Sequence, residues 1–66
     1  MRITVNGQQR DVPDGTTVQG LLALLTVSRE ATAIEVNREL VPRSLQAGRA
    51  LAQGDAVEIV TLVGGG

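Results

Sequence analysis

Apolar and polar residues alternate in three parts of the chain, which is the pattern of strands with one buried face. These parts are residues 2–5, 32–37 and 56–62, and the last of them is the most apolar. A fourth apolar set has the i, i+3, i+4, i+7 spacing of one helix face, and its members are Val18, Leu21, Leu22 and Leu25. The pattern predicts a small α+β fold in which this helix covers one face of a sheet.

Turn-forming residues separate these parts. Asn6-Gly7 follows the first strand and is a strong hairpin signal, because a type I′ turn needs positive φ at both central residues. Residues 8–12 then return as a polar edge strand. Thr16 or Thr17 is expected to cap the helix. Gly20 lowers the stability of that helix by about 1 kcal/mol relative to alanine, and we interpret it as permitting a close approach to the sheet.

A second, shorter hairpin is expected to begin with residues 32–37. Its turn lies at residues 37–39, and its return strand starts at Leu40-Val41 and ends at Pro42, which cannot donate to a sheet. Residues 44–49 are irregular with one helical turn, and Leu45 is expected to anchor that segment to the core. A final turn at Gln53-Gly54-Asp55 leads into the last strand.

The order of these elements predicts the topology of the sheet. The last strand is the least polar and therefore belongs in the centre beside the first strand, and a right-handed crossover makes that pair parallel. A mixed sheet of four to five strands with one helix packed across one face is the β-grasp, or ubiquitin-like, arrangement. We expect residues 1–63 to form one such domain and residues 64–66 to be a flexible glycine tail.

The residue types that are missing limit the chemistry of the chain. Its 66 residues include no Cys, His, Lys, Phe, Trp or Tyr, which excludes disulfides, Cys/His zinc sites and Schiff-base lysines. No serine stands beside a base in a recognisable pattern, and a chain of this size has difficulty enclosing a ligand pocket of about 300 Å³. We therefore expect a substrate of other enzymes that is not itself an enzyme and that binds no cofactor and no metal.

The charge and hydropathy of the chain also limit its partners. A net charge of −1 and the absence of aromatic residues argue against a nucleic-acid partner. No apolar run approaches the roughly 20 residues that span a membrane, and the N-terminus lacks the apolar region of a signal peptide. A soluble, cytoplasmic protein is expected.

The sequence ends in three glycines, Gly64, Gly65 and Gly66, for which two interpretations are open. Glycine is costly to order, so such a run is often a frayed end or a linker remnant. The same run is also the thinnest possible chain end, able to thread a narrow channel and present its carboxylate to another protein's active site. Because the rest of the chain offers no catalytic side chains, the carboxylate of Gly66 is the candidate reactive group.

Several segments together resemble the ThiS-type sulfur carriers of thiamine biosynthesis. They are Val5-Asn6-Gly7, the leucine-bearing helix, Val36-Asn37-Arg38-Glu39-Leu40-Val41-Pro42-Arg43, Gln53-Gly54-Asp55 and Val63-Gly64-Gly65-Gly66. The resemblance covers the whole chain. Its most specific part is the Val-Asn-x-x-x-Val-Pro-Arg segment at a fixed distance from the Val-Gly-Gly-Gly ending.

This resemblance implies a carrier cycle centred on Gly66. A ThiF-type, E1-like adenylyltransferase, which holds the ATP and Mg in its own active site, would activate the carboxylate. A persulfide sulfur from a cysteine desulfurase or another persulfide donor would then displace AMP and leave a terminal thiocarboxylate. A ThiG-type thiazole synthase would take that sulfur into the thiazole ring of thiamine.

Strand parity predicts a docking surface next to this terminus. If Val57, Ile59 and Thr61 face the helix, then the residues between them face outward. Val60 and Leu62 would then form an exposed apolar patch that leads into the other expected partner-binding residues, Val63, Gly64 and Gly65. The alternative is a plain surface, because single exposed apolar residues are normal in soluble proteins.

Other functions fit many of the same features. Carriers for molybdopterin synthesis or tRNA thiolation share the fold and the Gly-Gly ending, and a ubiquitin-like protein modifier would use the same activated terminus. A plain interaction domain would carry an inert tail. The Val-Pro-Arg segment and the third glycine favour the thiazole pathway. Arg38 and Arg43 would either pair with acidic residues of a partner or stay solvated.

Overall fold

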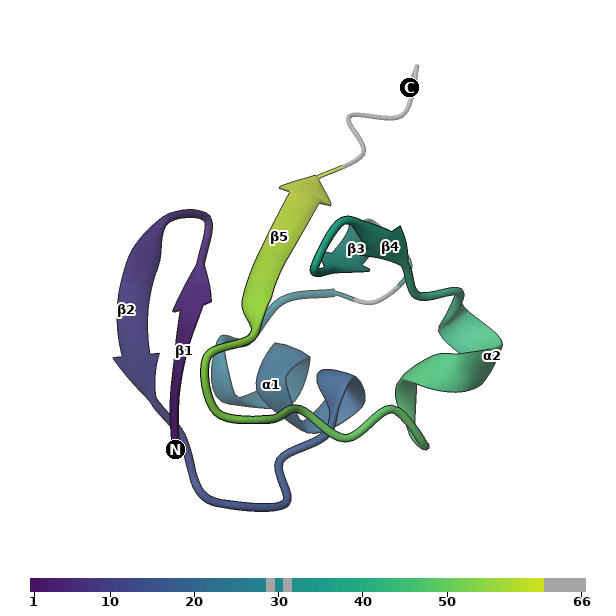
Figure 1. Cartoon of the computed structure of the whole chain (residues 1–66). Coiled ribbons are helices and arrows are strands. Elements are labelled where there is room, and N and C mark those ends of the chain that lie inside the picture. The colour runs from purple at the N-terminus through teal and green to yellow at the C-terminus, as the bar shows by residue number, and fades with distance from the viewer. Residues whose placement is uncertain (29, 31, 62–66) are drawn as a thin grey trace.

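The computed structural model describes residues 1–28, 30 and 32–61 and contains a five-stranded mixed sheet with two helices. Along the chain the elements are β1 (Arg2–Val5), β2 (Gln8–Asp11), α1 (Val18–Leu24), β3 (Thr32–Val36), β4 (Glu39–Leu40), α2 (Arg43–Gln46) and β5 (Ala56–Thr61). The strand order across the sheet is β2-β1-β5-β3-β4, so the last strand stands between the two hairpins (Figure 1).

The central position of β5 agrees with its composition. It pairs in parallel with β1, where Val5 lies opposite Val57, and antiparallel with β3, where Ile34 lies opposite Ile59. A strand with neighbours on both sides satisfies its backbone polar groups within the sheet. The predicted central placement and the parallel pairing of the first and last strands are therefore confirmed.

Both hairpins turn through residues in the left-handed region of backbone space. Asn6 and Gly7 have φ values of 49° and 83°, as the type I′ turn predicted for the first hairpin requires. Asn37 and Arg38 have φ values of 52° and 69°, so the second turn uses the same geometry without a glycine. Left-handed backbone is costly for a residue with a side chain such as that of arginine, so this turn carries strain at Arg38.

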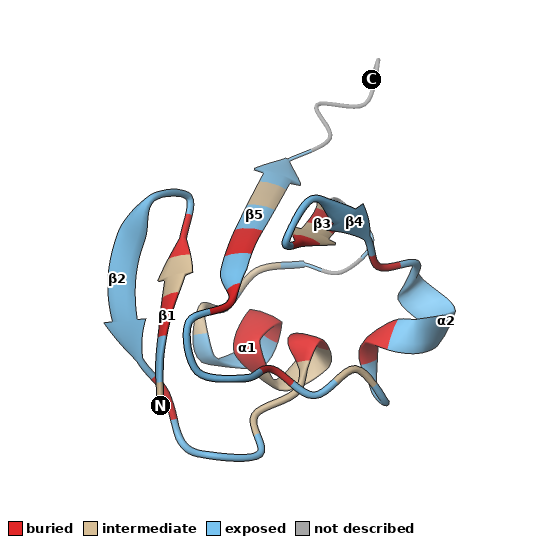
Figure 2. Cartoon of the chain, viewed as in Figure 1, coloured by how far each residue is buried: buried red, intermediate tan, exposed pale blue. Residues whose placement is uncertain are grey.

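The core lies between α1 and one face of the sheet. Thr17 caps α1 by accepting a hydrogen bond from the Gly20 N–H at 3.0 Å. The buried apolar residues are Ile3, Val5, Val12, Val18, Leu21, Leu22, Ile34, Val36, Val41, Leu51 and Val57. Figure 2 shows buried residues in α1, β1, β3 and β5, whereas both edge strands are exposed along their whole length. Leu25 packs against this core without being fully buried.

Two local predictions around Pro42 are wrong or need adjustment. Leu45 does not anchor the segment after Pro42, because its side chain is 59% exposed. The four-residue helix α2 instead buries Gln46, whose Nε2 donates to the Val41 carbonyl oxygen at 3.3 Å. The return strand β4 also begins one residue early and ends before Val41, which is buried beyond the strand.

Gly20 does not mediate a close approach to the sheet. A Cβ atom at this position would meet Thr17 Oγ1 at 3.4 Å and Thr16 Cγ2 at 3.7 Å, both in the capping segment. These are contacts within the start of the helix, so the sequence interpretation of Gly20 was wrong about what lies next to it.

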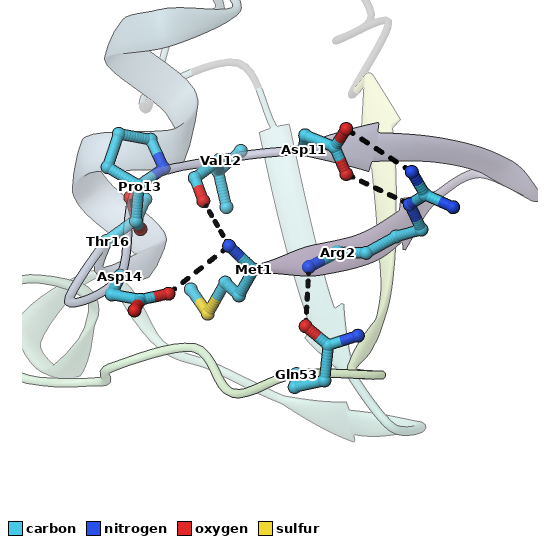
Figure 3. Close-up of polar contacts among 8 residues, drawn as sticks. All are labelled: Met1, Arg2, Asp11, Val12, Pro13, Asp14, Thr16 and Gln53. Atoms are coloured by element: carbon cyan, nitrogen blue, oxygen red, sulfur yellow. Dashed lines mark hydrogen bonds and ion pairs between the residues drawn. The ribbon is translucent and has the colours of Figure 1, made fainter.

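Polar contacts tie down the beginning of the chain (Figure 3). The amino group of Met1 donates to the Val12 carbonyl oxygen at 2.7 Å and lies 3.2 Å from a carboxylate oxygen of Asp14. Arg2 donates its backbone N–H to Gln53 Oε1 at 2.7 Å, and its guanidinium Nε lies 2.9 Å from Asp11 Oδ1. The first strand is thus held to the second strand and to the turn that precedes β5.

No helix within the described part of the chain is long and apolar enough to cross a membrane.

Candidate docking face and carrier terminus

Most of the predicted terminal site falls at the end of the chain. Gly66, Gly65, Gly64, Val63 and Leu62 lie outside the described residues, whereas Val60 is described. The part of the site that the structure describes is therefore the strand β5 and the sheet face around Val60.

The two faces of β5 differ in burial as strand parity predicts. Val57 is buried and Ile59 partly buried on the helix side, whereas Glu58 and Val60 are exposed on the opposite side. Val60 has 55% of its surface exposed. Thr61, expected on the helix side, lies opposite the buried Thr32 but is itself exposed at the end of the strand.

The register of the sheet adds three residues that sequence reasoning missed. On the face away from α1, Ala33 lies directly opposite Val60, and Glu35 lies opposite Glu58. Leu40 of β4 lies opposite Glu35 and is 64% exposed. We call these five residues the open face: Ala33, Glu35, Leu40, Glu58 and Val60. Alternation within residues 32–37 places the first two on the outward face, but only the register shows that they adjoin β5.

The open face combines apolar area with unpaired negative charge. Glu35 and Glu58 are a cross-strand pair of like charges, an arrangement that destabilises a sheet. Neither carboxylate forms an ion pair within the described parts of the chain. A partner surface with a cation and apolar side chains would complement both features.

The two arginines that the sequence singled out differ in their surroundings. Arg43 Nη1 lies 3.8 Å from Glu30 Oε1, so this side chain already has an acidic neighbour within its own chain. Arg38 is exposed at the strained turn between β3 and β4. Of the two arginines, Arg38 is therefore the better candidate to pair with an acidic residue of a partner.

Two turn asparagines hold β5 from opposite sides. Asn6 accepts from the Ile59 N–H through Oδ1 at 2.8 Å and donates through Nδ2 to the Ile59 carbonyl oxygen at 3.2 Å. Asn37 accepts from the Ala56 N–H through Oδ1 at 3.0 Å and donates through Nδ2 to Asp55 Oδ1 at 3.0 Å. Sequence reasoning interpreted both residues as turn formers only, because nothing in a turn motif indicates which distant strand its side chain contacts.

The described residues offer little that could hold a metal or a cofactor. No group of three or more His, Cys, Asp or Glu side chains gathers within residues 1–28, 30 and 32–61. A surface depression of about 330 Å³ lies on the helix side of the sheet, where Leu25, Val27 and Ile59 are among its lining residues and Arg10 supplies the cation. Its volume reaches the lower end of the range of ligand sites, but its lining residues include no carboxylate, histidine or thiol.

Comparison with known proteins assigns the chain to a family. The model of the ThiS family matches residues 3–66. The chain belongs to the ThiS family. The sequence resemblance is therefore confirmed at the level of the family, and the match includes the segment that carries the three glycines.

The similar proteins include a sulfur carrier and thiazole synthases. A sulfur carrier protein ThiS of Escherichia coli (strain K12) is 30% identical over 66 residues, which is the full length of both chains. A thiazole synthase of Paramagnetospirillum magneticum is 41% identical over 66 residues, and one of Magnetococcus marinus is 36% identical over the same length. The chain spans about a fifth of the length of these two thiazole synthases, matching 20% of each.

A solved structure confirms the fold of this family member. The crystal structure of a thiamine biosynthesis protein (ThiS) from Geobacter metallireducens superposes with a TM-score of 0.86 at 35% identity and covers 100% of both chains. The predicted β-grasp arrangement of a mixed sheet with a helix across one face is thus correct.

Proposed function

We propose that this chain is a sulfur carrier that delivers sulfur for the thiazole moiety of thiamine and is not itself an enzyme. The observation that carries the proposal is the family match over residues 3–66, which extends through the glycine ending. Two thiazole synthases contain a region similar to this chain, which supports a partnership between the carrier and that enzyme. The composition agrees, since a chain without Cys, His or Lys has few groups for catalysis of its own.

In the proposed cycle the reactive group is the carboxylate of Gly66, which must then be a chain end. One carboxylate oxygen attacks the α-phosphorus of ATP in a ThiF-type enzyme, and pyrophosphate leaves. A persulfide sulfur attacks the resulting acyl-adenylate, so that a C–S bond forms and AMP departs. A thiol then cleaves the S–S bond, leaving the thiocarboxylate that a ThiG-type thiazole synthase consumes.

The three glycines suit this role on physical grounds. Side chains at positions 64–66 would obstruct a narrow channel in the partner. Fixing the backbone of each residue costs about 1–2 kcal/mol, and contacts between the partner and the folded body must offset that cost. We assign this docking to the open face, whose apolar residues and unpaired carboxylates lie beside the last strand.

The ATP and Mg would be bound by the adenylating partner. The sequence has no Gly-x-x-x-x-Gly-Lys phosphate loop, since it has no lysine. The persulfide would come from a cysteine desulfurase or a comparable donor. We place the protein in the cytoplasm with these partners, and with no role in nucleic-acid or membrane binding.

The proposal is tested by intact-mass analysis of the reacted chain. The purified protein is incubated with a ThiF-type enzyme of the same genome, ATP, Mg²⁺, a persulfide donor and a thiol. Replacement of one oxygen by sulfur, localised to Gly66 by fragmentation, is the expected result. Isopeptide adducts on other proteins would indicate a protein modifier instead, and an unchanged mass with every activating enzyme of that genome would overturn the idea of an activated terminus.

A second measurement separates the thiazole pathway from other sulfur pathways. The thiocarboxylate form is supplied to a ThiG-type thiazole synthase, to a molybdopterin synthase and to a tRNA thiolation system of the same genome. Sulfur transfer to the thiazole product alone is expected. Deleting Gly66, or adding one residue after it, should abolish sulfur loading while the thermal unfolding midpoint stays unchanged.

A further inference from the structure

The side chain of Asn6 continues the pairing of β1 with β5 beyond the point where β1 ends. The Thr4 N–H donates to the Asp55 carbonyl oxygen at 3.0 Å, and the Asn6 N–H donates to the Val57 carbonyl oxygen at 2.9 Å. The next position toward the end of β5 that faces β1 is Ile59. Both its N–H and its carbonyl oxygen are bound by the side-chain amide of Asn6, at 2.8 and 3.2 Å.

This arrangement exists because the backbone leaves the sheet at the turn. Asn6 and Gly7 have φ values of 49° and 83°, which carry β2 back along β1 and away from the end of β5. A side-chain carboxamide has the same donor and acceptor groups as a peptide unit. Asn6 therefore replaces the strand residue that would otherwise have paired with Ile59.

The bonds to Ile59 lie near the end of the described part of β5. Ile59 is followed by the exposed Val60 and by Thr61, and residues 62–66 come directly after them in the sequence. On its other side β5 is held by β3, which pairs as far as Thr32 opposite Thr61. Asn6 is thus the contact that holds β5 from the β1 side at Ile59, two residues before the last described residue.

Asn37 provides an internal comparison at the other end of the same strand. It also has positive φ in a turn and also makes two side-chain hydrogen bonds, but to Asp55 and to the Ala56 N–H. These contacts fix the start of β5, which lies ten residues before Gly66. The two asparagines are matched in chemistry and backbone and differ in which end of β5 they hold.

We propose that Asn6 is a positioning residue for the carrier terminus, because its hydrogen bonds to Ile59 fix the end of β5 from which the terminus extends. This inference rests on the proposed function. The partner's nucleotide site requires the carboxylate within reaction distance, and a misplacement of about 1 Å can cost a hundredfold in rate. Asn6 acts through Ile59 and does not itself touch ATP or sulfur.

The test compares Asn6→Gly with Asn37→Gly. Glycine adopts positive φ freely, so both variants keep their turns. Both variants lose two side-chain hydrogen bonds. In both, glycine raises the conformational entropy of the unfolded chain by a similar amount. Adenylation by the ThiF-type enzyme is followed as pyrophosphate release, at a temperature where circular dichroism shows each variant fully folded. Backbone amide exchange is measured by NMR on the free proteins.

We expect Asn6→Gly to speed exchange of the Ile59 amide and to lower kcat about tenfold, which corresponds to a loss of roughly 1.4 kcal/mol. KM should stay within twofold, because β3 still holds the open face at Ala33 and Val60. Asn37→Gly should leave kcat within twofold. Asn6→Asp keeps an acceptor for the Ile59 N–H and should restore part of the lost kcat, which a role confined to the turn would not predict.

Two outcomes would overturn the inference in different ways. Equal kcat values for Asn6→Gly and Asn37→Gly, with the wild type adenylated normally, would reject the positioning role and leave the carrier function intact. A wild-type chain that no activating enzyme of its genome adenylates would reject the carrier function, and the positioning role with it. In that second case the amide exchange data would still report whether Asn6 protects Ile59.

Discussion

Asn37 donates its side-chain amide to the carboxylate of Asp55 at 3.0 Å, so the β3–β4 turn is hydrogen bonded to the residue that precedes β5. The other carboxylate oxygen accepts from the Ala52 N–H at 2.8 Å, and Asp55 is only 8% exposed. Because hydrogen bonds to charged groups contribute roughly 1.5–3 kcal/mol, we predict that Asp55→Ala lowers the free energy of unfolding by about 3 kcal/mol. Urea denaturation of the purified variant measures this loss.

The same pair allows an exchange of the two side chains as a control. Asp55→Asn and Asn37→Asp should each be destabilising, since each brings two donors or two acceptors together. The double variant restores one donor and one acceptor, and it should recover most of the stability in a double-mutant cycle. Additive losses in the double variant would show that the two side chains are not energetically coupled.

A substitution at Arg38 is predicted to increase the stability of the fold, because the backbone there is strained. Its φ of 69° is unfavourable for a residue with a side chain, by about 1–2 kcal/mol in the left-handed region. Arg38→Gly should therefore raise the unfolding free energy by about 1 kcal/mol, measured by thermal and urea unfolding. Arg10→Gly in β2 is the control, since glycine weakens a strand. Stabilisation by both variants would mean that loss of the charge, and not relief of the turn, is responsible.

The sequence predicted those parts of the fold that depend on local patterns. The Asn6-Gly7 turn, the apolar face of α1 and the alternation in β5 each follow from the residues themselves. The prediction that Leu45 is buried was wrong because, in a helix of one turn, apolar character does not decide which side chain points inward. In α2 the buried side chain is that of Gln46, whose amide donates to a backbone carbonyl oxygen. A buried polar residue that donates to a nearby backbone carbonyl group leaves no periodic signal.

Of the candidate site, the sequence predicted only the part that lies on β5 itself. Parity placed Val60 outward, but the neighbours that give the open face its chemistry, Ala33 and Glu35, depend on the register between β3 and β5. The two asparagine contacts with β5 depend on the packing of turns against a strand up to 53 residues away. Register and long-range contacts arise from the whole sheet, which single-sequence patterns do not encode.

The opposed glutamates predict an effect of salt on stability. Glu35 and Glu58 lie directly opposite each other on the open face. Glu58→Gln should raise the unfolding free energy by about 0.2–1 kcal/mol at low ionic strength, and the gain should shrink in 1 M salt, where the Debye length is about 3 Å. Glu39→Gln is the matched control, because Glu39 faces Val36 across the strands. An equal gain in both variants would indicate a general effect of net charge.

The ion pair of Asp11 with Arg2 leads us to predict a loss of stability in acid. The pKa of Asp11 lies below its usual value because the Arg2 guanidinium donates a hydrogen bond to it and is positively charged. A carboxyl group whose pKa is lower in the folded state stabilises the fold above its unfolded pKa of about 3.9. That contribution is lost as the pH falls through the folded pKa.

The corresponding measurement is urea unfolding between neutral pH and pH 2. Asp11→Asn should be less stable than the wild type at neutral pH, and the difference should vanish as the pH falls from about 4. The effect should be small, because both side chains are exposed to solvent. Arg2→Gln should remove the same pH dependence. A constant difference at all pH values would show that Asp11 acts through something other than its charge.

Val60 tests whether the open face is the surface that the adenylating partner binds. It is 55% exposed, and burial of a valine side chain in an interface contributes about 1.5–3 kcal/mol. Val60→Glu should therefore raise the Kd for the ThiF-type enzyme at least tenfold, measured by calorimetry without ATP. Leu45→Glu introduces the same charge at a position that is 59% exposed on α2, and it should change the Kd less than twofold. Similar losses in both variants would mean that added negative charge, and not contact with the open face, weakens the complex.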